Sequence, residues 1–74
     1  MRLGKYLTSL TKSELEELKD ELNMTDDEIL VFDQISHGRS IVATADRCNI
    51  ATSTVSNRIK NISKKVSKLE EKRD

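Results

Sequence analysis

Most of the side chains with recognisable chemistry lie in one segment, from Ser40 to Ile62. The first part of this segment carries Ala45 at a position where two closely crossing helices would leave room for little more than a methyl group. The second part is rich in small polar and basic side chains. Between them lies Asn49, and asparagine tolerates the left-handed backbone that a tight turn requires. This order is typical of a helix-turn-helix.

The second helix of this motif should expose one polar face. If Val55, Ile59 and Ile62 are buried, its other side presents hydrogen-bonding side chains of modest size. These side chains are Thr52, Ser53, Ser56, Asn57 and Lys60. Groups of this kind can bond to base edges in the major groove of duplex DNA. We therefore expect a recognition helix at about residues 52–62.

Basic residues surround this face. Seven of them, against the single acid Asp46, lie between residues 39 and 68. Contacts to phosphates supply most of the affinity of DNA-binding modules, and cationic side chains make most of these contacts. The side chains expected to position the helix on phosphates are Arg39, Thr54, Arg58 and Lys65, with Lys64 in the same interface. For the lysines after residue 63, a plain solvated face is the simpler interpretation.

The chain is also divided by charge. Residues 1–34 hold four basic and nine acidic side chains, and residues 35–74 hold nine basic and four acidic ones. A net charge of zero thus hides a basic half that could face a polyanion and an acidic half that could not.

Two threonine-glutamate patterns predict where the helices in front of the motif begin. Thr11 with Glu14, and Thr25 with Glu28, have the spacing of capping boxes, in which each side chain bonds to the backbone of the other residue. We expect the first of these helices to end near residue 23 and the second to span about residues 26–36, with an N-terminal arm or helical turn before them.

The helix-turn-helix should begin with another cap. Ser40 is a natural N-cap, and Gly38 before it suits a left-handed backbone at the end of the preceding helix. Ile41, Ala45 and Cys48 are spaced four and three apart, so we expect them to face the core.

The last helix carries an apolar stripe that runs beyond the length of a recognition helix. Its members, spaced 4-3-4-3, are Val55, Ile59, Ile62, Val66 and Leu69. The end of the stripe could pack on the leucines of residues 3–10 or on the same helix of a second copy, and we favour self-association. The dimer contacts would then be Ile62, Val66 and Leu69.

Composition limits the remaining classes of protein. The 74 residues contain no proline, two glycines and two aromatic residues, which favours an all-α domain over a sheet-based nucleic-acid binder. One cysteine and one histidine give no metal-ligand pattern, and no nucleophile is paired with a base, so we expect no catalytic residue, metal or cofactor. No apolar run has the length of a membrane span and no signal-peptide pattern is present, so we expect a cytoplasmic protein.

From Met24 to Val66 the sequence resembles the LuxR/GerE-type DNA-binding domain and its relative, the fourth region of bacterial sigma factors. The residues in register with that family are Thr25, Glu28, Val31, Phe32, Gly38, Ser40, Ala45, Thr54 and Val55. Ala51 stands where the family often has a serine cap, so Thr52 could cap the last helix instead. The resemblance implies four or five helices, the last long one lying in the major groove, and a role in bacterial or phage transcription.

The sequence therefore predicts one small helical bundle of four to five helices. Residues 1–23 form an N-terminal arm and helix, residues 24–66 the helix-turn-helix core, and residues 67–74 the end of a long C-terminal helix. The predicted function is sequence-specific binding of double-stranded DNA by a small transcription regulator, as a monomer or homodimer. The alternative is a module that docks on a regulator or a polymerase subunit without binding DNA.

Overall fold

The computed structural model describes residues 2–72 as helices and short connections, with no strand in that range. The helices are α1 (Leu3–Thr8), α2 (Lys12–Leu22), α3 (Asp26–Ser36), α4 (Ile41–Cys48) and α5 (Thr52–Lys72). The prediction of a small all-α bundle with a long C-terminal helix is confirmed.

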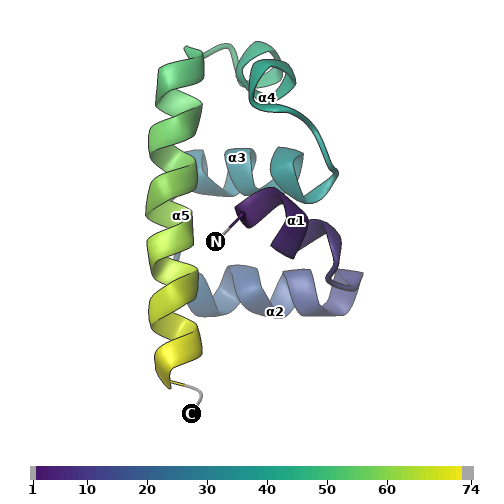
Figure 1. Ribbon diagram of the computed structural model, residues 1–74, viewed down its shortest axis with the longest axis vertical. Coiled ribbons are helices and arrows are strands. Elements are labelled where there is room, and N and C mark those ends of the chain that lie inside the picture. The colour runs from purple at the N-terminus through teal and green to yellow at the C-terminus, as the bar shows by residue number, and fades with distance from the viewer. Residues whose placement is uncertain (1, 73–74) are drawn as a thin grey trace.

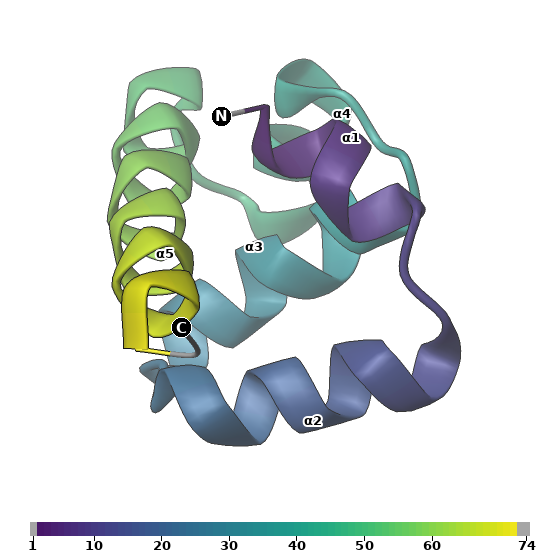
Figure 2. The ribbon, with the colours of Figure 1, turned by 60° about the horizontal axis from the view of Figure 1, so that its bottom comes forward.

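Helix α5 runs the length of the molecule, and the four shorter helices all lie on one side of it (Figures 1 and 2). The molecule measures 36 × 21 × 21 Å. At 1.5 Å per residue a helix of 21 residues is about 31 Å long, so α5 accounts for most of the long dimension. One complete side of α5 consequently remains uncovered.

The predicted caps are present at the starts of α2 and α3. The Thr11 hydroxyl accepts a hydrogen bond from the Glu14 amide, and the Glu14 carboxylate accepts one from the Thr11 amide. Thr25 and Glu28 make the same reciprocal pair. Each box satisfies two amides at a helix N-terminus that have no partner within the helix, which is why the two helices begin at these residues.

Left-handed residues mark where three helices end. Asn23 follows α2 with φ 51°, Gly38 follows α3 with φ 80°, and Asn49 follows α4 with φ 57°. Asparagine and glycine are the residue types that reach this region at low cost. The predicted helix end near residue 23 and the predicted left-handed positions at Gly38 and Asn49 are confirmed.

Gly38→Ala is expected to lower the free energy of unfolding by about 1 kcal/mol, because an L side chain at positive φ is strained. An added Cβ at Gly38 would meet only the Thr8 methyl group at 3.8 Å, so the cost arises from the backbone and not from a clash. Gly4→Ala is the control, since Gly4 lies in α1 without positive φ and has similar space, 3.7 Å to Ile35. Urea unfolding followed by circular dichroism measures both; equal effects of the two substitutions would show that the positive φ at Gly38 carries no cost.

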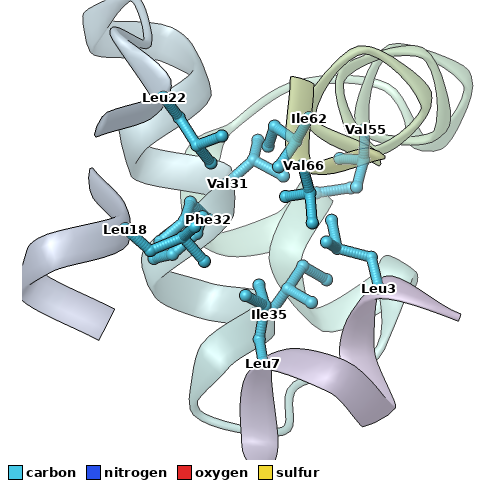
Figure 3. Packing of buried hydrophobic residues seen from close by; sticks show 11 residues of the cluster. Leu3, Leu7, Leu18, Leu22, Val31, Phe32, Ile35, Val55, Ile62 and Val66 are labelled. Atoms are coloured by element: carbon cyan, nitrogen blue, oxygen red, sulfur yellow. The ribbon is translucent and has the colours of Figure 1, made fainter. Parts of the chain in front are cut away.

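All five helices contribute side chains to one hydrophobic cluster (Figure 3). Its most deeply buried large members include Phe32 and Val31 of α3, Leu7 of α1, and Val55 and Ile62 of α5. Burial of these side chains is the main force that holds the short helices against α5.

The stripe on α5 packs inside the protomer. Ile62 and Val66 are fully buried, and Val66 points toward Leu3 in the core (Figure 3). Leu69 is half-buried and packs against the same cluster. Fully buried side chains cannot contact a second copy, so the predicted dimer contacts at Ile62 and Val66 are wrong. The alternative, in which the stripe packs on the N-terminal leucines, describes the structure instead.

The inward face of α4 also differs from the prediction. Ala45 is buried and Cys48 is half-buried, as expected, but Ile41 is 40% exposed and Thr44 is completely buried. Ile41 is the first residue of α4, where no preceding helical turn helps to cover it. The face that meets the core therefore runs through Thr44, Ala45 and Cys48.

Candidate nucleic-acid interface

The turn between α4 and α5 is three residues long and is held by backbone bonds. The Ser40 hydroxyl caps α4 by accepting from the Ala43 amide at 3.1 Å. After α4, the Ile50 amide donates to the Ala45 carbonyl at 3.0 Å while Asn49 adopts the left-handed conformation. Ile50 packs against the core, which holds the turn in place. The residues that predict this turn therefore lie within it or next to it in the sequence.

Helix α5 begins at Thr52, and Ala51 occupies the position in front of it. The Ala51 carbonyl accepts from the amides of Thr54 and Val55, at 3.1 and 3.2 Å. Thr52 is already inside the helix, so the idea that it caps α5 is wrong. The first turn of α5 has no acidic residue, and alanine provides no side-chain cap.

The side of α5 that faces away from the bundle is polar along its whole length. At about 100° per residue, the positions opposite Val55, Ile62 and Val66 form one continuous strip, which we call the outer face. All its members are exposed: Ser53, Asn57, Lys60, Asn61, Lys64, Ser67, Lys68 and Glu71. Three of the predicted base-contacting residues, Ser53, Asn57 and Lys60, lie in its first three turns.

The other predicted residues of α5 lie beside this strip. Thr52 is exposed, whereas Ser56 and Thr54 are half-buried on opposite flanks of the helix. Asn61 also belongs to the outer face, although it is not among the residues predicted from the sequence. The 3.6-residue period would have found it, because it lies four residues after Asn57.

Arg58 and Lys65 also lie on a flank, and both are held by acids of α3. The Arg58 guanidinium is 3.6 Å from the Asp27 carboxylate, and the Lys65 ammonium is 2.7 Å from Glu28. Arg58 and Lys65 are one heptad apart on α5, and their partners are neighbours at the start of α3. Both pairs lie between α5 and α3, so part of the positive charge predicted for phosphates is compensated within the protein.

Glu28 is the centre of the stronger pair. It is 5% exposed, and one carboxylate oxygen accepts bonds from the Lys65 ammonium, the Thr25 amide and the Thr25 hydroxyl. The hydrogen bond from Lys65 lowers the pKa of Glu28 below its ordinary value of 4.5, with help from Thr25, although burial acts in the opposite direction. One carboxylate thus joins the cap of α3 to the middle of α5.

Glu28→Gln is expected to lower the free energy of unfolding by about 1–2 kcal/mol at neutral pH, since glutamine can keep the capping box but not the ion pair. A group with a lowered pKa in the folded state stabilises the protein above its ordinary pKa, and the contribution disappears as the pH falls through the folded value. The deficit of the variant should therefore shrink below pH 4.5.

Glu14→Gln provides the comparison, because Glu14 makes the same capping box at an exposed position and has no lysine partner in the described part of the chain. Urea unfolding at stepped pH values measures both variants. An equal loss of stability in the two variants would show that the Lys65 contact contributes nothing.

Arg39 is not brought to α5. It lies in the loop of residues 37–40 between α3 and α4, and in both ribbon views this loop is across the molecule from α5 (Figures 1 and 2). The Arg39 side chain is half-buried, with its Nε buried and without a hydrogen-bond partner. The structure therefore separates Arg39 from α5, which carries all the other predicted contacts.

Within residues 2–72, no group of three or more His, Cys, Asp or Glu side chains could hold a metal ion. None of the helices described has both the length and the apolar character to cross a membrane. Comparisons with family models, with curated proteins and with solved structures give no match to this chain.

Proposed function

We propose that this protein binds duplex DNA through the outer face of α5 and acts as a small transcription regulator. The observation that carries the proposal is the exposed strip from Ser53 to Lys68, which is polar and basic and lies on the side of α5 that the bundle leaves free. A helix presented in this way can enter the major groove, which is about 12 Å wide.

Charge supports the same partner. Between residues 52 and 69, α5 carries five basic side chains and no acidic one. The side chains in its first three turns, Ser53, Asn57 and Lys60, can donate and accept hydrogen bonds at base edges. Asparagine pairs well with adenine and lysine with guanine, so these residues are the proposed source of sequence preference.

The second candidate is a module that docks on another protein. It is favoured by three large apolar side chains that are exposed outside α5, namely Leu30 at 55%, Ile41 at 40% and Val42 at 70%. The outer face itself contains no large apolar residue, whereas aromatic side chains and methionine are enriched at protein interfaces. The outer face therefore suits DNA better than a protein surface, and docking would use the other side.

Selection from random duplex DNA tests the proposal. We expect an enriched sequence motif, and fluorescence anisotropy should show its affinity falling at least about 40-fold between about 50 and 200 mM salt, as three or more phosphate contacts require. Absence of both an enriched motif and salt-dependent binding would contradict the proposal and leave the docking module as the function.

A further inference from the structure

An open groove of about 440 Å³ lies along the flank of α5 next to the start of α3. Four cationic side chains line it: Arg58, Lys64, Lys65 and Lys68. Thr25 and Asn61 add polar groups, and Glu28 is the only acid in its wall. The groove is adjacent to the outer face, because Asn61, Lys64 and Lys68 belong to both.

The four cations are not equivalent. Arg58 and Lys65 are engaged by Asp27 and Glu28, as described above. Lys64 and Lys68 have no carboxylate within 4.0 Å among the described residues, and both are exposed. Arg58 and Lys65 are half-buried and paired, whereas Lys64 and Lys68 are exposed and carry positive charge that no described carboxylate contacts.

The arrangement of the unpaired lysines is unfavourable for the helix itself. Lys60, Lys64 and Lys68 follow each other at intervals of four residues, so like charges are stacked on successive turns. The helix dipole favours cations only in the last turn, which does not account for Lys60 or Lys64. Residues that break a local rule without a structural gain are expected at functional sites.

We propose that this groove, through Lys64 and Lys68, binds the phosphate backbone of the DNA strand that borders the major groove entered by the first turns of α5. The inference rests on the proposed function and deepens it. Along a helix, Lys64 and Lys68 lie about 10 and 16 Å from Asn57, and the major groove is about 12 Å wide. Lysine acts on phosphate as a mobile point charge, which suits a contact with the backbone.

In this proposal the phosphate contacts are made by Lys64 and Lys68 and not by Arg58 and Lys65. Arg58 and Lys65 pair with the acids of α3, whereas Lys64 and Lys68 contact the DNA strand. A side chain that contacts only the backbone contributes affinity and salt dependence but no preference among sequences. Lys64 and Lys68 should therefore differ from Asn57 and Lys60 in a measurable way.

The test is Lys64→Ala with Lys68→Ala, compared with Lys5→Ala and Lys12→Ala. The control removes the same charge from exposed lysines of α1 and α2. Loss of two phosphate contacts should reduce the steepness of log binding constant against log salt concentration by about 2. When salt is raised from about 50 to 200 mM, the factor by which affinity falls should therefore be about ten times smaller for the variant than for the wild type. Selected and scrambled duplexes should be weakened by the same factor.

A Lys64→Ala, Lys68→Ala variant whose salt slope equals that of the control would overturn the groove assignment, provided that the wild type binds DNA. Failure of the wild type to bind any duplex would instead refute the proposed function. Thermal unfolding verifies that both double variants fold, and relief of the lysine repulsion should keep the Lys64→Ala, Lys68→Ala protein at least as stable as the wild type.

Discussion

Replacing Asn57 and Lys60 together by alanine is expected to weaken binding to a selected duplex by at least about 30-fold, because each base-contacting side chain contributes about 1–3 kcal/mol. Both residues are exposed in the first three turns of α5, on the strip that faces away from the bundle. The loss should be accompanied by relaxed preference at the base pairs they contact. Anisotropy titrations against the selected duplex and its single-base variants measure both effects.

The control for this experiment is Lys5→Ala with Ser13→Ala, which removes one cation and one small polar side chain from exposed positions of α1 and α2. Its affinity should stay within a few-fold of wild type, since only general electrostatics change. An Asn57→Ala, Lys60→Ala protein that binds its selected duplex as tightly as this control would show that α5 does not contact the bases.

Phe32→Ala is expected to lower the free energy of unfolding by about 3–5 kcal/mol, the usual cost of removing a buried aromatic ring. Phe32 is completely buried, and the Lys19 ammonium lies 5.9 Å from the centre of its ring. A domain of 74 residues typically has only about 4–11 kcal/mol in total. The variant should therefore be partly or wholly unfolded at physiological temperature.

Leu30→Ala on the same helix is the matched control for Phe32→Ala. Leu30 is 55% exposed, and its replacement should change stability by no more than about 1 kcal/mol. Urea unfolding monitored by circular dichroism compares the two. Similar midpoints for both variants would contradict the placement of Phe32 at the centre of the core.

The helices and turns could be predicted from the sequence because their signals are local. The capping boxes at Thr11 and Thr25 specify where α2 and α3 begin, and Asn49 specifies the turn before α5. Each signal depends on side chains within a few residues of the backbone groups they satisfy. Such features need no knowledge of how the helices pack.

The predictions that were wrong, and the contacts that were not predicted, depend on parts of the chain that are distant in sequence. The stripe through Ile62 and Val66 could have faced a second copy, and only the position of Leu3 and its neighbours decides that it is buried. The partners of Arg58 and Lys65 are more than 30 residues away in sequence. A basic side chain that is free and one that is already paired look the same in a sequence.

Binding of DNA by the exposed strip of α5 can be located residue by residue in an NMR titration. When a selected duplex is added to ¹⁵N-labelled protein, the largest amide shift changes should occur between Ser53 and Lys68, with little change in the first two turns of α2. The largest changes in α2, or no change at saturating DNA, would show that α5 is not the DNA-binding element.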